Sequence, residues 1–471
     1  MDLRKQSAVI FSSEAANSIL GFVAIVLFAR EIGATQMGIF FLFQAVIGII
    51  AIPTDLGLRG AIEKRISEGQ PANRVLTTAV LLKMVPATAI IILIFLFGNH
   101  FNNYIGSDVA LYLTLGLILK EFAGVVNHVL IGEMRAEHSG TIQFARQVVW
   151  IASSAIFVFL GFEANALIWG LLAGWTFKFL LGWHLSLTSF GMPTLDCAQS
   201  LLAFAKYNSI SFLQSTIYRW MDVAIIGLFL TPAHVGAYEI AWRVAQTVII
   251  LSQAISIVIL PQISKWSAEG QFDQIEQLIS DTITPALFFI IPIFVGSIFV
   301  SQPLLTHVFG AEYAIASVAL VILLGERHFH ALFEVFRRSL LGIDRPDLVA
   351  RAILVTLALN LSINLLLVQI YGINGVAFGT AASFFMSMVL HWYYLSRFLT
   401  VQLPLYELGW CMLSATGMAA VLMVIQLFTT IHTLSELIGI VAIGGAVYIL
   451  IAFIYKPFRE QIYNEIRTTI T

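Results

Sequence analysis

The sequence has few charged residues. Asp, Glu, Lys and Arg make up 11% of the 471 residues, whereas 59% are hydrophobic and the mean hydropathy is +0.90. A soluble domain carries roughly 25% charged residues, so this chain has too few charges to cover a water-exposed surface. We therefore expect the lipid bilayer to be its main solvent, which argues against a soluble enzyme.

Several chemical motifs are also missing. The two cysteines, Cys197 and Cys411, form no CxxC pair and indicate no disulfide framework. A net charge of −2 and the lack of any Lys/Arg-rich run argue against a nucleic-acid partner. The sequence contains no GxxxxGK[ST], HExxH, GxSxG or DxD motif. We therefore expect neither an ATP-driven pump nor an enzyme, and no cofactor or metal. The energy would come from an ion gradient, the membrane potential or the substrate's own gradient.

The chain is rich in apolar stretches of about 20 residues, the length that a membrane-spanning helix needs. They lie near residues 12–30, 37–58, 75–97, 109–131, 142–161, 164–186, 207–230, 235–261, 280–301, 315–341, 349–370, 374–397, 407–430 and 434–455. The pattern predicts an all-α polytopic membrane protein with about 14 transmembrane helices. The longest hydrophilic loops, expected at 59–74 and 262–279, are too short to form a catalytic domain with its own core.

The cations alternate from one predicted loop to the next. Lys and Arg near helix ends are retained on the cytoplasmic side of a membrane. Nineteen of the 25 Lys and Arg residues, among them Arg59, Lys83 and Arg146, fall on one side, and only Arg30 falls in the opposite loops. We therefore expect an integral protein of the plasma (cytoplasmic) membrane with both termini in the cytoplasm.

Two blocks of six predicted helices resemble each other at an offset near 200 residues. RISEGQ at 65–70 matches ISKWSAEGQ at 263–271, LIGEMRAE from Leu130 matches LLGIDRPD from Leu340, and Gly38 matches Gly236. We interpret these matches as an internal duplication, which is typical of secondary transporters. The predicted organisation is an N-terminal six-helix lobe (1–186), a cytoplasmic connector (187–206), a C-terminal six-helix lobe (207–400), and two extra helices with a cytoplasmic tail (401–471).

Three sets of charged residues lie at mid-depth in predicted helices: Lys120 with Glu121, Arg219 with Asp222, and Glu326 with Arg327. Each ionisable group at a helix centre costs on the order of 2.5–3.5 kcal/mol, so these groups are expected to face an interior or a water-filled cavity. Adjacent residues do not face each other on a helix, whereas Arg219 and Asp222, three apart, can pair. The helices of the first and third sets are duplicate partners, so we expect an acid and a base at equivalent places in both halves.

These charges have two interpretations. They are structural ion pairs between helices, or they belong to a polar cavity lined by the first, seventh and eighth helices and closed by the fourth and tenth. Polar stripes with helical spacing favour the cavity; Glu14 lies on such a stripe in the first helix and Arg243 on one in the eighth. Asp55 and Arg59, at the inner end of the second helix, either gate this cavity or form an ordinary solvated helix end.

Several local patterns together resemble one known family. They are FAREIGATQMGIFFLFQA at 28–45 with DLGLRGAIEKRISEG at 55–69, WMDVAIIGLFLTPAHVGAYEIAWRV at 220–244 with ILPQISKWSAEGQFDQ at 259–274, and the LLGIDRPD turn with INLLLVQIYGINGVAFGTAAS at 363–383. The joint pattern resembles the polysaccharide transporter family, the oligosaccharide flippases of the multidrug/oligosaccharidyl-lipid/polysaccharide (MOP) exporter superfamily. The resemblance covers essentially the whole chain.

The resemblance implies two lobes in a V that alternate access and carry a polyprenyl- or dolichyl-diphosphate-linked oligosaccharide from the cytoplasmic to the outer leaflet. A diphosphate in a partly dry cavity favours Arg and Lys as ligands. The candidate substrate-binding residues are Lys120, Arg219, Arg243, Arg327, Lys178 and Arg30. The candidates for coupling or gating, with a proton or sodium ion as the coupling ion, are Glu14, Asp55, Glu121, Asp222 and Glu326.

Three other functions compete with that of a flippase. A cation-coupled multidrug exporter of the same superfamily would prefer acidic sites, and the mid-depth cations count against it. A membrane-embedded glycosyl- or acyltransferase would need catalytic carboxylates or a histidine beside a sizeable outer loop, which the sequence does not show. A non-transporting scaffold in polysaccharide assembly stays open at this point.

Overall fold

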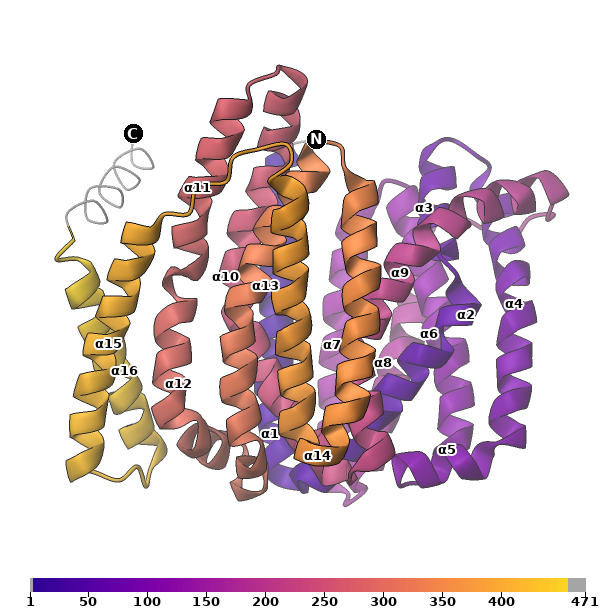
Figure 1. Ribbon diagram of the computed structural model, residues 1–471. Coiled ribbons are helices and arrows are strands. Elements are labelled where there is room, and N and C mark those ends of the chain that lie inside the picture. Colours follow the sequence, from indigo (N-terminus) through magenta and orange to yellow (C-terminus); the bar gives the residue numbers. More distant parts are fainter. Residues whose placement is uncertain (1–2, 456–471) are drawn as a thin grey trace. The chain divides into compact units, whose positions relative to one another are not determined.

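The computed structural model describes the backbone of residues 3–455 and the side chains of residues 17–206, 216–249 and 259–455. Over that backbone the regular structure is helical, with no β-strand, so the expected all-α class is confirmed. The first half of the chain contains α1 (Leu3–Ile50), α2 (Ile52–Asp55), α3 (Leu58–Ser67), α4 (Ala72–Leu96), α5 (Gly98–Ile105), α6 (Ala110–Gly132), α7 (Ala136–Phe159), α8 (Glu163–Leu185) and α9 (Leu195–Phe229) (Figure 1). The second half contains α10 (Pro232–Ala268), α11 (Phe272–Phe288), α12 (Ile290–Leu304), the short helices η1 (Leu305–Phe309) and η2 (Ala311–Ala316), α13 (Ser317–Gly342), α14 (Pro346–Leu395), α15 (Leu405–Phe428) and α16 (Leu434–Ala452).

Ten segments of the described residues are long and apolar enough to cross a membrane, so the chain is an integral membrane protein. Two of these segments are interrupted, because Gly33 in α1 (φ 78°) and Gly372 in α14 (φ 58°) have non-helical backbones. Glycine adopts a positive φ readily, and both glycines fall in the gaps between predicted spans. In Figure 1 α14 accordingly forms two orange arms, joined by a hydrogen bond from Asn360 to Thr380 at 3.3 Å. The predicted count of about 14 crossings is compatible with these breaks.

The chain divides into two compact units, Met1–Gly236 and Ala237–Thr471. Unit 1 contains α1 to α9 and the first residues of α10, and unit 2 contains the remaining helices. The predicted lobe limits at residues 186 and 207 follow the sequence repeat instead, and they stay a prediction.

A matching turn in each unit supports the internal duplication. The turn after α6 places Met134 at φ 60°, and the turn after α13 places Asp344 at φ 59°. In both turns the next residue donates its N–H to the carbonyl five residues earlier, at 2.9 Å. A positive φ is uncommon outside glycine, so its recurrence at the predicted repeat positions indicates a shared origin.

Glycines at the ends of these two helices make equivalent contacts. A Cβ placed at Gly132 would lie 2.8 Å from the Cβ of Ile66, and one at Gly342 would lie 2.8 Å from the Cβ of Ile263. The two isoleucines come from the stretches that the sequence repeat had matched. The duplication is therefore visible in contacts as well as in sequence.

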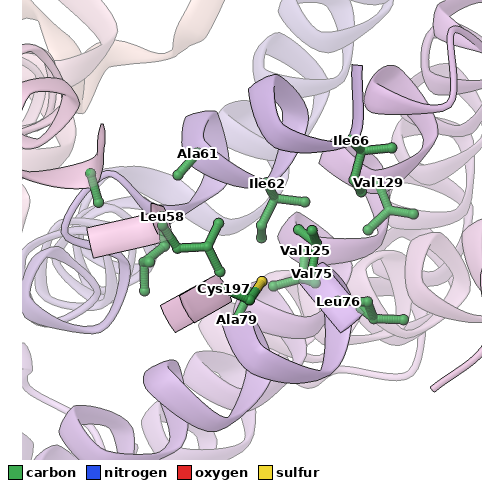
Figure 2. Packing of buried hydrophobic residues seen from close by; sticks show 12 residues of the cluster. Leu58, Ala61, Ile62, Ile66, Val75, Leu76, Ala79, Val125, Val129 and Cys197 are labelled. Atoms are coloured by element: carbon green, nitrogen blue, oxygen red, sulfur yellow. The ribbon is translucent and has the colours of Figure 1, made fainter. Parts of the chain in front are cut away.

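The prediction of a hydrophilic loop at 59–74 is wrong, because α3 occupies most of this stretch. Ala61, Ile62 and Ile66 repeat at helical spacing and are buried. Figure 2 shows them packed against side chains of α4, α6 and the start of α9. The many charged residues of this stretch obscure its apolar face in the sequence. Through that face α3 and α9 pack against the rest of unit 1.

At the end of α3 the exposed Glu68 accepts hydrogen bonds from Lys64 and Arg65, which lower the pKa of the Glu68 carboxyl.

The second expected loop, at 262–279, is also mostly helical. α10 continues to Ala268 and α11 begins at Phe272. Ile263, Ile275 and Ile279 are fully buried within unit 2. As in α3, isoleucines at helical spacing form a buried face although the overall composition of the stretch is polar.

The closest backbone approach in unit 1 joins two glycines of the sequence repeat. A Cβ at Gly38 would lie 1.7 Å from the carbonyl oxygen of Pro232, and one at Gly236 would lie 2.1 Å from that of Ala34. Neither contact partner is a side chain that can turn away. Glycine is therefore required on both sides of this contact.

We expect Gly38→Ala to lower the free energy of unfolding by about 3 kcal/mol. This is the upper end of the usual cost of overpacking, because a backbone atom blocks the new methyl group. The matched control is Gly140→Ala in α7, where no atom lies within 4 Å of the added Cβ. That change should stabilise the protein by about 0.5–1 kcal/mol, since alanine is the better helix former. Unfolding in mixed micelles measures both values, and equal effects at the two positions would contradict the packing described.

Candidate functional site

Four side chains of unit 1 form a closed and largely buried ring of ion pairs, here called the unit 1 network: Asp55, Arg59, Lys83 and Glu121. Arg59 Nη2 donates to Glu121 Oε1 at 2.7 Å, and Arg59 Nε lies 3.2 Å from Asp55 Oδ1. Lys83 Nζ donates to Glu121 Oε2 at 2.6 Å and also to Asp55 Oδ1. Two acids and two bases alternate around the ring, so the network is neutral when all four are ionised.

The local backbone explains how residues from four helices meet here. Leu56 (φ 42°) and Gly57 (φ 81°) interrupt the chain between α2, which ends with Asp55, and α3, which carries Arg59. On α6, a Cβ at Gly124 would lie 2.6 Å from Arg59 Nε. Glycine at position 124 therefore leaves the space in which the guanidinium reaches Glu121, one helical turn earlier.

The network corrects two expectations from the sequence. Asp55 is 1% exposed, so the interpretation of this residue as part of a solvated helix end is wrong. Lys83 had been assigned to the cytoplasmic surface, but it is 4% exposed in α4 and lies between two carboxylates. Its position near the middle of an apolar stretch is the signal that would have identified it. Asp55 and Glu121, both candidates for coupling or gating, do lie together.

Two candidate cations of unit 1 have different surroundings. Lys120 lies beside the network and donates from Nζ to the carbonyl oxygen of Ile47 at 3.2 Å. Lys178, on α8, is 9% exposed. Among the described side chains, none makes a hydrogen bond or ion pair with Lys178. A charged lysine without a counter-charge inside a membrane protein costs on the order of 2.5–3.5 kcal/mol.

A second buried polar group lies within unit 2, on α13 and α10. Arg327 Nε lies 2.7 Å from Glu326 Oε2, and Arg327 Nη1 donates to Gln246 Oε1 at 2.8 Å. His330 Nδ1 lies 3.3 Å from Glu326 Oε1, and the His330 ring stacks on Phe384 with centroids 4.4 Å apart. Glu326 and Arg327 are 0% and 1% exposed.

This group corrects two further expectations. Adjacent residues were expected not to pair, yet Glu326 and Arg327 do, because the long arginine side chain folds back along its own helix. The acids of the two halves are also not at equivalent depth. Glu121 lies eleven residues before Gly132, whereas Glu326 lies sixteen residues before Gly342, counted from the turns that match.

The remaining candidates have the following surroundings. Arg243, one turn before Gln246 on α10, has its Nη2 3.0 Å from Oε1 of the buried Glu239. The Arg219 guanidinium lies 4.2 Å from the centre of the Trp220 ring, a cation–π contact. Asp222 is buried, and Arg30 is exposed. The side chain of Glu14 falls outside the described residues.

Unit 2 also contains an apolar cavity of about 390 Å³, which the sequence did not indicate. It lies among α10, α12, α13, α15 and α16. Its walls include Pro292, Gly296, Met418, Leu422 and Gly444. Such a lining suits a hydrocarbon chain rather than a polar group.

Related sequences point to one family. A family profile described as "Polysaccharide biosynthesis protein" matches residues 8–318. A relative from Haloferax volcanii, the probable low-salt glycan biosynthesis flippase Agl15, is 42% identical over 468 residues, which cover 99% of each chain. The probable flippase AglR of the same organism is 25% identical, over 98% of each chain.

Solved structures share the fold. The lipid II flippase MurJ, in an inward closed conformation, has a TM-score of 0.79 at 16% identity and covers 97% of this chain and 100% of its own. An inward-facing MATE multidrug resistance transporter of the MOP superfamily has a TM-score of 0.67 at 16% identity, covering 81% of this chain and 94% of its own. The family resemblance drawn from the sequence motifs is thus confirmed: the chain belongs to the family described as "Polysaccharide biosynthesis protein".

Proposed function

We propose that this protein is a flippase that moves a lipid-diphosphate-linked oligosaccharide from the cytoplasmic to the outer leaflet. Its two lobes would alternate access, and the product would serve the assembly of surface polysaccharide or glycoprotein. The observation that carries the proposal is the 42% identity, over 99% of both chains, to Agl15, which is described as a probable glycan biosynthesis flippase.

The cations of the chain fit the head group of such a substrate. A diphosphate is recognised by charge-assisted hydrogen bonds from Arg and Lys, which are strong where water is partly excluded. We assign this role to Lys120, Arg219, Arg243, Arg327, Lys178 and Arg30 as candidates. The acids Glu14, Asp55, Glu121, Asp222 and Glu326 are the candidates for gating or for binding a coupling proton or sodium ion.

The lipid part of the substrate also finds a suitable environment. A polyprenyl or dolichyl chain is hydrocarbon, and most of it can stay in the bilayer. The apolar cavity of unit 2, with about 390 Å³ of space, would hold a segment of that chain. The predicted orientation, with both termini in the cytoplasm of a plasma-membrane protein, agrees with loading from the inner leaflet.

A cell that lacks this gene tests the proposal. We expect lipid-linked oligosaccharide to accumulate in a form protected from an external glycosidase, while surface glycan decreases, and the intact gene should reverse both changes. Normal surface glycan together with lost resistance to cationic dyes would contradict the proposal and favour the drug exporter. A deletion that removes surface glycan without such accumulation would favour a scaffold.

A further inference from the structure

One face of α8 has residues spaced by four that pack unusually closely: Gly170, Gly174, Lys178 and Gly182. A Cβ at Gly170 would lie 2.0 Å from Ser154 Oγ on α7. At Gly174 it would lie 3.1 Å from the Arg146 carbonyl oxygen, and at Gly182 it would lie 2.8 Å from Val126 Cγ1 on α6. Lys178 is the one member of this row with a side chain. It is therefore held where α8 packs against α7 and α6.

The side chain of Lys178 is more than nine-tenths buried there. No described side chain offers it a hydrogen bond or an ion pair. The charges that act on it come from Arg146 on α7 and from Arg59 on α3, both positive. Among the described side chains, the hydrogen bond of the Arg146 guanidinium goes to a neutral group, the Oε1 of Gln147, at 3.1 Å.

This arrangement contrasts with the unit 1 network a short distance away. There each cation is matched by a carboxylate, and Arg59 uses its Nε and Nη2 on Asp55 and Glu121. Lys178 and Arg146 have no acid of this kind among the described residues. Lys178 is buried and Arg146 is half-buried. Two neighbouring cations without an acid among the described residues would be stabilised by an anion brought from outside.

We propose that Lys178 and Arg146 form an anion subsite inside unit 1 that holds a phosphate of the lipid-diphosphate head group. The proposal rests on the flippase function and names the part of the chain that takes the charged group. Lys178 lies seven residues before the end of α8, and Arg146 lies ten residues after the start of α7. Both helix ends are predicted to be cytoplasmic, so the subsite would lie about 10–15 Å into the membrane from the side on which the substrate is loaded.

Binding to the full-length protein in nanodiscs tests the subsite, with farnesyl diphosphate as the probe. We expect Lys178→Met to weaken binding at least 10-fold and Arg146→Gln to weaken it several-fold. Lys178→Arg should stay within about threefold of the wild type, because it keeps the charge and the donors. The control Arg74→Gln, which removes an exposed cation of α4, should leave the affinity unchanged.

Three results would overturn the subsite. The first is unchanged affinity in the Lys178→Met, Arg146→Gln double variant. The second is equally tight binding of inorganic pyrophosphate, since a free anion rather than the lipid head group would then occupy the site. The third is restoration of the thermal stability lost in Lys178→Met by adding Glu14→Gln, which would make Lys178 the structural partner of a carboxylate on α1.

The flippase function and the subsite fail in different ways. If the wild type flips its substrate while the double variant binds and flips equally well, the subsite is wrong and the function stands. If the wild type neither binds nor flips any diphosphate lipid, the function itself is wrong.

Discussion

Lys83→Met is expected to lower the free energy of unfolding by about 3–5 kcal/mol, because it leaves Asp55 and Glu121 buried with one cation between them. Reversible unfolding in mixed micelles measures the change. The control is Lys64→Met, which removes a cation from the exposed ion pair with Glu68 at 2.8 Å. Exposed pairs contribute about 0–1 kcal/mol, so this control should unfold almost as the wild type does.

Removing one acid along with Lys83 should recover much of that loss. The Lys83→Met, Glu121→Gln variant leaves Asp55 with Arg59, at 3.2 Å, and restores a neutral interior. We therefore expect the double variant to be more stable than Lys83→Met alone, with a coupling energy of about 0.5–3 kcal/mol between the two positions. Strictly additive losses would show that the two residues do not share the network described.

The pair Glu326 and Arg327 should show the second large effect. Arg327→Ala leaves the fully buried Glu326 without its counter-charge, which should cost about 3–5 kcal/mol. Loss of transport in that variant would therefore say little about substrate binding. The informative variant is Glu326→Gln with Arg327→Gln, which removes both charges, keeps the shape of the Glu326 side chain and leaves a shorter polar side chain at position 327.

We expect the double Gln variant to insert and unfold nearly as the wild type does, yet to translocate substrate at least 10-fold more slowly. The reason is that Arg327 is a candidate ligand of the diphosphate and Glu326 a candidate coupling group. The matched control is Arg337→Gln on the same helix, where Glu334 keeps Arg338 at 3.3 Å as a second partner. If the double Gln variant transports substrate at the wild-type rate, the role of Glu326 and Arg327 is structural and they do not act in transport.

The membrane spans could be predicted from the sequence because length and hydropathy determine them directly. Even the two breaks at Gly33 and Gly372 fall where apolar stretches pause. The helix α3 could not be found in this way. Its buried isoleucines are separated by charged residues, and a search for long apolar stretches passes over an amphipathic helix of ten residues.

The site was predicted only in part, for a related reason. Glu121 is a candidate because charge at depth is costly, and Asp55 is one because it ends the second predicted helix. Lys83 counts as a loop cation in the sequence, although it lies well inside α4. Arg146 was placed at the surface in the same way. Which acid meets which base depends on packing, as at Gly124, where one missing methyl group admits the Arg59 guanidinium. Spacing along a single helix cannot supply that information.

We expect the unit 1 network to have a use beyond stability. Replacing buried ion pairs by apolar residues is often neutral or stabilising, so their value lies in fixing one arrangement of neighbouring helices. The ring joins the end of α2, the start of α3, α4 and α6 at four side chains. A unit that moves as one body during transport needs such a fixed arrangement. We expect the single Lys83 variant to lose transport together with stability.

The central claim is tested most directly in proteoliposomes that contain the purified protein and a fluorescent diphosphate-linked oligosaccharide lipid in both leaflets. A membrane-impermeant quencher added outside measures how much lipid becomes accessible with time. We predict protein-dependent crossing of the diphosphate-linked oligosaccharide, and much slower crossing of the same lipid without its diphosphate. Equal rates with and without protein, across several glycans and under an imposed proton or sodium gradient, would contradict the claim that this chain is a flippase.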